Sequence, residues 1–112
     1  MSDSIKNCKN LRYLDLSVNQ LIKLPEGVSQ LVNLEELFLS DTYLEYLMAN
    51  FGRLTKLKIL ELRENSLQSL PKSMNRLTQL QRLDIGQNDV SELVIIHALH
   101  FVFLLSNFLL CI

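Results

Sequence analysis

Leucine residues recur along this chain at a fixed interval of 23 residues. The interval separates Leu14, Leu37, Leu60 and Leu83, and the residues around them repeat with it. Three full turns and part of a fourth can be read after Leu14, and a partial turn precedes it. A unit of this length cannot bury its own apolar face, so neighbouring units must stack. The period therefore predicts a row of coils that share one continuous core.

Within each turn, two apolar residues are separated by one other residue, as in Leu37-Phe38-Leu39. Alternate side chains of a strand point to the same face, so these pairs predict short strands whose leucines point inward. The full spacing, L-x-x-L-x-L-x-x-N-x-L, resembles that of a leucine-rich repeat. It predicts an α/β repeat fold: a leucine-rich-repeat solenoid with a concave parallel β-sheet and short helical turns on the convex side.

An asparagine follows the strand position in three turns, as Asn19, Asn65 and Asn88. The chain turns at this point and leaves backbone groups that need partners. We therefore predict a structural ladder of asparagine side chains. Thr42 holds this position in the second turn, and because it has one hydroxyl in place of an amide, we expect fewer hydrogen bonds at that corner.

The outer segments begin at Pro25 and Pro71, which we expect at the first helical position, where a missing N–H costs little. Met48 and Val94 replace the proline in the other turns. Apolar residues at spacings of three are predicted to form the core: Val28, Leu31, Leu34, Phe51, Leu54, Leu57, Met74, Leu77 and Leu80. Cys8 falls at an equivalent leucine position, which favours a buried apolar thiol over a reactive one.

Residues that alternate with the strand leucines are predicted to face the concave side. They include six carboxylates (Asp15, Glu36, Asp41, Glu61, Glu64, Asp84) and two arginines (Arg63, Arg82). With Tyr13 and Phe38, these residues form the predicted protein-binding face. One interpretation is that the charges only solubilise the solenoid, and the other is that the acidic face binds a basic, extended protein segment. The outer segments are basic, and a further alternative is an approach to anionic lipid; these residues are Lys6, Lys9, Lys23, Arg53, Lys56, Lys72 and Arg76.

Several functional classes find no support in the sequence. A net charge of −1 and a pI near 6.1 argue against nucleic-acid binding. His97 and His100 lack a carboxylate or cysteine at metal-ligand spacing, and the three glycines form no phosphate loop. We expect no catalytic, cofactor or metal site and no small-molecule substrate. Two distant cysteines and the lack of an early apolar run favour a cytoplasmic location.

The pattern changes near Leu93, so we divide the chain into a repeat region, 1–94, and a hydrophobic tail, 95–112. Extending the period predicts apolar residues at 97, 100, 103 and 106, and only Phe103 complies. The twenty residues from Leu93 to Ile112 carry no charge and are enough to cross a bilayer, although basic flanking residues are lacking. The alternatives are a membrane anchor and an aberrant terminus. Both ends lack a polar capping turn, which suggests a piece of a longer solenoid.

Four stretches carry a more specific resemblance: IKNCKNL, LPEGVSQLVNLEELFLSDTYLEYL, ANFGRLTKLKILELREN and LPKSMNRLTQLQRLD. From about residue 5 to 90, the chain resembles the amino-terminal repeats of the leucine-rich-repeat and PDZ scaffold (LAP) family, which includes Scribble, Erbin and Densin. The resemblance implies a non-catalytic cytoplasmic adaptor at the basolateral membrane and cell junctions, acting in cell polarity and receptor signalling. A Ras-pathway adaptor of similar repeats and the regulatory segment of a larger repeat-containing enzyme remain alternatives.

Overall fold

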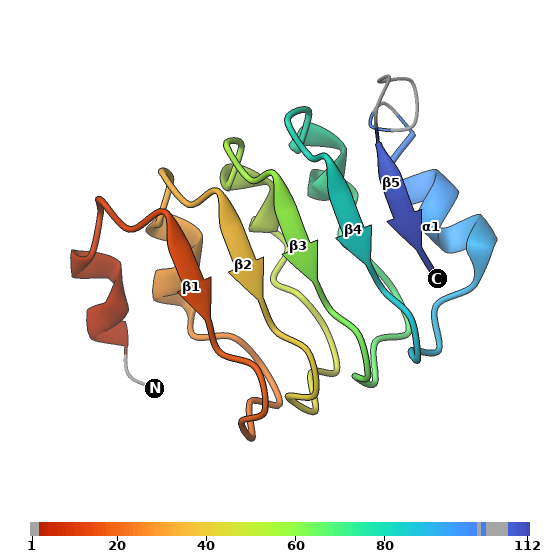
Figure 1. Cartoon of the computed structure of the whole chain (residues 1–112), viewed down its shortest axis with the longest axis horizontal. Helices are drawn as coiled ribbons and strands as arrows, with labels where there is room; N and C mark the ends of the chain where they lie inside the picture. Colours follow the sequence, from red (N-terminus) through yellow and green to blue (C-terminus); the bar gives the residue numbers. More distant parts are fainter. Residues whose placement is uncertain (1–2, 101, 103–107) are drawn as a thin grey trace.

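The computed structural model describes residues 3–100, 102 and 108–112. Five short parallel strands form one sheet in the order β1-β2-β3-β4-β5 (Figure 1). Their bounds are β1 (Tyr13–Asp15), β2 (Glu36–Phe38), β3 (Ile59–Glu61), β4 (Arg82–Asp84) and β5 (Leu109–Cys111). The strand leucines Leu14, Leu37, Leu60 and Leu83 lie directly beside one another. The 23-residue period of the sequence is therefore the register of the sheet, and the predicted solenoid is confirmed.

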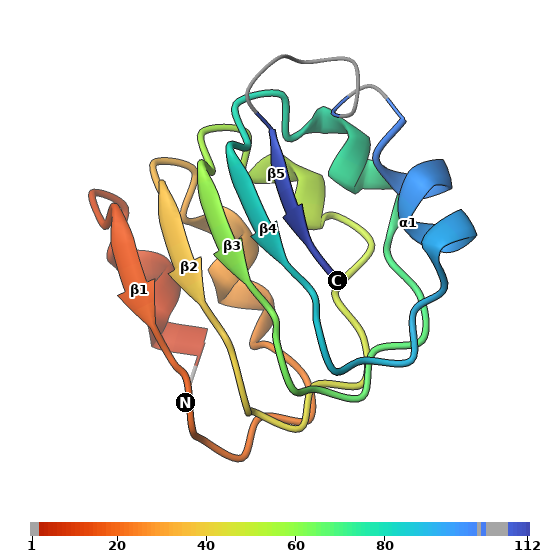
Figure 2. The same ribbon diagram turned by 45° about the vertical axis from the view of Figure 1, so that its right-hand side comes forward.

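Short helices form a second layer behind the sheet (Figures 1 and 2). They are η1 (Asp3–Asn7), η2 (Glu26–Gln30), η3 (Phe51–Arg53), η4 (Lys72–Arg76) and α1 (Glu92–Ala98). The first four are 3-10 helices, in which side chains three residues apart are aligned, and this suits the apolar spacing of three. Pro25 and Pro71 are the N-caps of η2 and η4. We predicted the two prolines at the first helical position, and the structure places them one residue earlier.

The core lies between these two layers. The nine apolar residues predicted from the outer segments are all buried, with Phe51 fully enclosed, and so are the strand leucines of β2 and β3. Leu14 of β1 and Leu16 just after it are only half-buried, because no strand of the described residues pairs with the outer edge of β1. Cys8 is exposed, so our prediction of a buried thiol was wrong. Its repeat position is a core position only where a preceding coil covers it.

We number the coils from their strand leucines: the first is 14–36, the second 37–59 and the third 60–82. The asparagine ladder joins them. In the third coil, Asn65 Nδ2 donates to the carbonyl oxygens of Leu39 at 2.8 Å and Leu62 at 3.0 Å. Its Oδ1 accepts the N–H groups of Thr42 at 2.9 Å and Leu44 at 3.0 Å. One side chain therefore holds two adjacent coils together.

The ladder is weaker on either side of Asn65. Asn88 donates to Leu62 O at 2.8 Å and accepts from Leu67 N at 3.0 Å, whereas Asn19 is exposed and bonds only within its own coil. The buried Thr42 hydroxyl lies 2.9 Å from Leu39 O and 3.0 Å from Asn65 Oδ1, and among the described residues its side chain accepts no backbone N–H. The expectation of fewer bonds at this corner is confirmed.

Four residues spaced 23 apart have left-handed backbones: Val18, Asp41, Glu64 and Gln87, with φ between 56° and 59°. They form the corner that follows each strand. Tyr43 is the fifth such residue, with φ of 63°, and its equivalents in the other coils do not share this conformation. A left-handed backbone costs an ordinary side chain about 1–2 kcal/mol, so the strain at Tyr43 is specific to the second coil.

The sheet and the core continue into the carboxy-terminal segment beyond residue 94. Strand β5 pairs with β4 in the register Arg82↔Leu109, an offset of 27 residues in place of 23. Helix α1 begins after Ser91, whose hydroxyl accepts the N–H of Val94 at 3.3 Å. The buried side chains of this segment join the common core: Ile95, Ala98, Leu99 and Val102. The connection from β4 to β5 is thus longer than the others and contains the α-helix α1, yet the two strands still pair in parallel. A fixed period of 23 residues could not predict this longer connection.

His97 and His100 are exposed because they lie away from that buried face. The predicted positions 103 and 106 lie outside the described residues. Within the described part of the chain, no helix has the length and apolar character required to cross a membrane.

Candidate functional site

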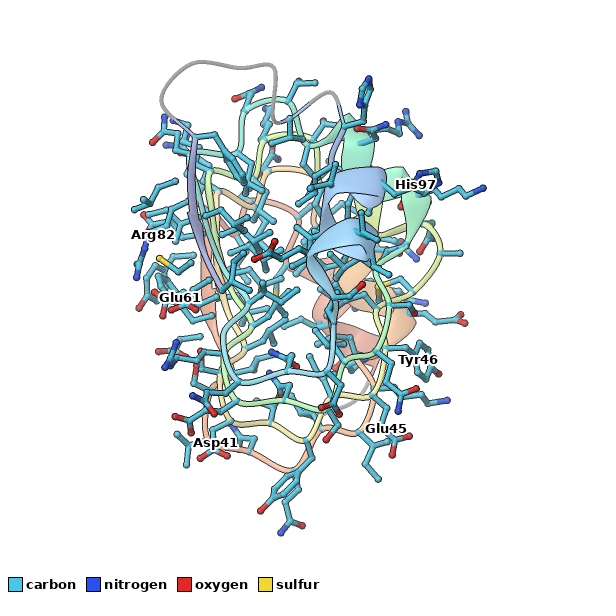
Figure 3. The ribbon with its side chains drawn as sticks, turned by 90° about the vertical axis from the view of Figure 1, so that its right-hand side faces the viewer. Asp41, Glu45, Tyr46, Glu61, Arg82 and His97 are labelled. Atoms are coloured by element: carbon cyan, nitrogen blue, oxygen red, sulfur yellow. The ribbon has the colours of Figure 1, made fainter. Side chains whose placement is uncertain are left out.

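The candidate site is the face of the sheet that is turned away from the helices. Side chains that alternate with the buried leucines lie there in two rows across the strands. Figure 3 shows Glu61 and Arg82 on this side of the molecule, opposite His97. The strands bring seven of the ten predicted site residues onto this face: Tyr13, Asp15, Glu36, Phe38, Glu61, Arg82 and Asp84.

The remaining three predicted residues lie beyond the strands, and Asp84 differs from the other strand residues in being buried. Asp41 and Glu64 are exposed at the left-handed corners, beyond the ends of β2 and β3. Arg63 lies just after β3, and its Nη1 is 3.6 Å from Asp84 Oδ1. Asp84 is only 8% exposed and also accepts the N–H of Gly86 at 3.1 Å. A partner on the concave face would therefore have little access to Asp84, in contrast to our prediction.

Both arginines of the concave side are already paired. Arg82 Nη1 donates to Glu61 Oε2 at 3.1 Å, and Arg63 pairs with Asp84. These contacts leave four of the six carboxylates with no ion pair among the described residues: Asp15, Glu36, Asp41 and Glu64. The net negative charge therefore lies towards β1, β2 and the corners, whereas β4 is close to locally neutral.

Aromatic side chains accompany this charge. The rings of Tyr13 and Phe38 are 5.2 Å apart between centroids, with 44° between their planes. Tyr13 is 54% exposed. Because Glu36 lies beside Tyr13 in the sheet and Asp15 beside Phe38, the ring pair is flanked by unpaired carboxylates. This part of the face can offer both apolar contact and negative charge to one partner.

A charge cluster at the start of the strands was missed by the sequence analysis. Glu35 lies 3.7 Å from Arg12 Nε and 3.3 Å from Lys58 Nζ, so it bridges two cations of neighbouring coils. The signal was the alternation of charge at positions 12, 35 and 58, which share one place in the repeat. Such exposed pairs add little stability, about 0–1 kcal/mol each, but they neutralise this edge of the concave face.

Within the described ranges, no group of three or more histidine, cysteine or acidic residues is arranged to hold a metal ion. His97 lies on the convex side, opposite Glu61 and Arg82 (Figure 3), and His100 lines the same hollow as His97 and Lys72. The arrangement of the concave side is that of a binding surface of strands, charges and rings.

The comparison with known families agrees with this geometry. Residues 2–105 match the family model described as leucine-rich repeat region. The chain belongs to the leucine-rich-repeat family. Domains of this family are typically protein-binding modules without catalytic function, and their extended concave surfaces are commonly used for binding.

Two solved structures resemble this leucine-rich-repeat chain closely. A leucine-rich-repeat protein of Leptospira interrogans shares 34% identity with a TM-score of 0.88, over 100% of this chain and 28% of that one. The plant peptide hormone receptor RGFR1, in complex with RGF2, shares 25% identity with a TM-score of 0.76, over 99% of this chain and 18% of that one. The chain spans less than a third of either protein. No curated protein matches it.

Proposed function

We propose that this leucine-rich-repeat chain binds a basic, extended protein segment along β1 and β2. The observation that carries the proposal is the Tyr13–Phe38 ring pair, which the unpaired carboxylates of Asp15 and Glu36 flank. A bound segment could place aliphatic stems on the rings and cationic ends on the carboxylates. Electrostatic complementarity of this kind raises association rates and excludes acidic partners. The receptor neighbour, solved with RGF2, supports peptide binding by such a scaffold.

The test is fluorescence anisotropy with a labelled peptide of alternating lysine and threonine. We expect Asp15→Lys and Glu36→Lys each to weaken binding about tenfold at low salt, because each replaces an attraction by a repulsion. Glu26→Lys, which makes the same charge change on η2, is the matched control. Equal losses for the control and the concave variants would show only a response to net charge and would refute the proposal.

In the cell, we propose the role of a polarity and junction scaffold, with its binding partner at the basolateral membrane. The resemblance of about residues 5–90 to LAP-family repeats supports this role. We expect a fluorescent fusion expressed in polarised epithelial cells to concentrate at lateral membranes, and the doubly substituted Asp15→Lys/Glu36→Lys fusion to become diffuse. Binding to a GTP-loaded Ras-family protein, with no lateral concentration, would favour the Ras-pathway alternative.

The basic outer segments support a secondary contact with anionic membranes. All seven lysines and arginines predicted there are exposed, and Leu93 is 79% exposed near Lys72 around a shared hollow. We expect the chain to float with vesicles that contain phosphatidylserine and not with neutral ones. Replacement of Lys72 and Arg76 by glutamine should reduce flotation, at about 1 kcal/mol for each charge. Equal flotation with neutral vesicles would contradict an electrostatic contact.

A further inference from the structure

Exposed apolar side chains gather at one edge of the solenoid, beyond the carboxyl ends of the first two strands. Their exposed fractions are 75% for Val18, 58% for Ile22, 58% for Tyr43 and 48% for Tyr46. Polar residues take the equivalent positions in the third coil: Glu64, Gln68, Ser66 and Ser69. The apolar patch is therefore confined to the first two coils. Single exposed apolar residues are common, but a cluster of them often marks an interaction site.

This edge contains a hollow of about 340 Å³, lined by Gln20, Ile22, Tyr43, Glu45 and Ser66. Three successive coils contribute to it. The lining combines an aliphatic side chain, an aromatic ring, one carboxylate and two neutral polar groups. Figure 3 shows Glu45 and Tyr46 at the lower right, across the molecule from Glu61 and Arg82 on the sheet face. The hollow is thus separate from the concave surface of the proposed function.

The backbone around the hollow is held by hydrogen bonds between coils. Glu45 N donates to Ile22 O at 3.0 Å, and Ser66 N donates to Leu44 O at 2.8 Å. Leu44 N in turn donates to Oδ1 of the partly buried Asn65 side chain at 3.0 Å. The lining positions are therefore fixed relative to one another before any partner arrives, which lowers the entropic cost of binding.

The strained residue Tyr43 belongs to this lining. In the third coil, Asn65 Oδ1 accepts the N–H of Leu44. The Thr42 side chain has no amide oxygen. The N–H equivalent to that of Leu44 is the N–H of Leu21, and it donates instead to the Thr42 backbone carbonyl at 2.8 Å. Turning this peptide plane towards Leu21 changes φ of Tyr43, which accounts for its left-handed value of 63°. The same rotation sets the position of the exposed ring, and retained strain of this kind is often found at functional sites.

The charges around the hollow are negative. Glu45 makes no ion pair within the described part of the chain, and neither do Asp41 and Glu64 on the adjoining corners. Lys23, which follows Ile22, is exposed and forms no ion pair with these carboxylates in the described structure. The hollow therefore combines a ring face, an aliphatic wall and a carboxylate without an ion pair. One arginine side chain matches all three: its charged planar guanidinium can stack on the ring, its stem can pack on the aliphatic wall, and its paired N–H donors can bind the carboxylate.

We propose that this edge hollow receives an arginine side chain of a protein partner. The aliphatic stem would pack on Ile22, and the guanidinium group would lie over the Tyr43 ring and donate to the Glu45 carboxylate. Arginine fits better than lysine, because its planar group stacks on a ring and offers paired donors to a carboxylate. This contact is independent of the segment proposed for β1 and β2.

The test is a titration of the ¹⁵N-labelled chain with N-acetyl-arginine-N-methylamide, followed by amide chemical shifts. The probe for comparison is the citrulline analogue, which has nearly the same shape and no charge. We expect saturable shifts at Ile22, Glu45 and Ser66, with at least about fivefold weaker binding of citrulline. Equal affinities, or shifts centred on Asp15 and Glu36, would overturn the proposal.

Variants sharpen the test. Glu45→Gln and Tyr43→Asn should each weaken arginine binding about fivefold. Glu26→Gln removes the same charge from η2 and should leave the affinity unchanged. Glu36→Lys, the concave variant, should also leave the edge shifts unchanged, so that failure of one proposal can be told from failure of the other. Full affinity of Glu45→Gln, in a chain whose spectrum shows it to be folded, would refute the assigned role.

Discussion

The second and third coils have the same length and the same buried leucines, yet they close their corners by different means. The third coil has Asn65 at the corner and Pro71 before its helix, whereas the second has Thr42 and Met48. Asn65 bonds to both coils, and the Thr42 side chain makes only one bond to a backbone group. The N–H groups of Leu44 and Leu67 are both bonded by the asparagine of the following coil, Asn65 and Asn88 respectively. The second coil differs because, among the described residues, its own corner side chain bonds to no backbone group of the preceding coil.

The other differences of the second coil are local. The second coil contains the strained Tyr43, and Ser40 Oγ in the same coil is a buried side-chain oxygen without a hydrogen-bond partner among the described residues. Its core positions Leu37, Leu44 and Phe51 are nevertheless fully buried. The comparison teaches that apolar spacing determines the coil, whereas the corner residues determine how its backbone groups are satisfied. A coil can lack the corner asparagine of the repeat if the next coil has it.

The largest effect on this comparison should come from Asn65→Ala. The change leaves the N–H groups of Thr42 and Leu44 and the carbonyl of Leu39 without this partner, and each buried unpaired group costs about 1–3 kcal/mol. We expect the free energy of unfolding, measured by urea denaturation with circular dichroism, to fall by about 3–4 kcal/mol.

Asn19→Ala is the matched control, because Asn19 is exposed and bonds only to its own coil. It should cost less than about 1 kcal/mol. Equal losses for the two variants would mean that the asparagine matters for its own corner alone, and the second coil would not depend on its neighbour.

The next effect tests how closely the two coils approach each other on the convex side. A methyl group at Gly52 of η3 would collide with the backbone carbonyl of Ser73 in η4, while Gly52 N donates to Ser73 Oγ at 2.9 Å. We expect Gly52→Ala to lower the free energy of unfolding by about 2–3 kcal/mol, because backbone cannot yield without moving a helix. A stability equal to that of the parent would show that the helices can separate without loss.

Gly86→Ala is the contrasting variant for Gly52→Ala, and the stability of both is measured by thermal denaturation. There the added methyl group would meet the end of the Arg63 side chain, which is flexible and partly exposed. We expect a loss below about 1 kcal/mol, with weakening of the Arg63–Asp84 pair. A larger loss than for Gly52→Ala would reverse the ranking of the two sites.

The sequence was sufficient to predict what depends on the period alone: the strands, their parallel register and the buried leucines. It failed where burial depends on a neighbour. Cys8 occupies a leucine position but is exposed, because a repeat position becomes interior only when another coil covers it. Strand β5 was missed because an offset of 27 residues breaks the phase, although the hydrogen bonds of β4 can accept a longer connection.

The candidate site shows the same division. Alternation along the strands predicted one common face for Tyr13 and Phe38, and their rings lie side by side in the structure. It could not show that Asp84 is buried under Arg63, since that depends on the direction of a flexible side chain and on the small residue at position 86. The edge hollow was also missed, because its lining comes from loop positions where the repeat pattern sets no residue type.

A smaller and opposite effect is expected if the second coil is made to resemble the third. Thr42→Asn would supply an oxygen for the N–H of Leu21 and a second amide donor for Leu39 O, which already accepts from Asn65. The equivalent carbonyl of the third coil, Leu62 O, accepts two such amides, from Asn65 and Asn88. We expect a gain of about 1 kcal/mol in urea denaturation. Thr42→Val, which has no hydroxyl, should instead be less stable than the parent. A loss with asparagine would show that the corner has adapted to the smaller side chain.

The smallest effect tests whether the peptide rotation is the cause of the strain. Tyr43→Asn should stabilise the parent by about 0.5–1 kcal/mol, because asparagine tolerates a left-handed backbone, whereas Tyr46→Asn should not. In the Thr42→Asn background, the Leu21 N–H no longer needs the backbone carbonyl, so Tyr43 should leave the left-handed region and the gain should vanish. Thermal denaturation of the four chains forms a double-mutant cycle. Additive gains in stability would show that the strain at Tyr43 does not arise from the missing asparagine at position 42. The left-handed backbone would then be a property of Tyr43 and not of the peptide rotation.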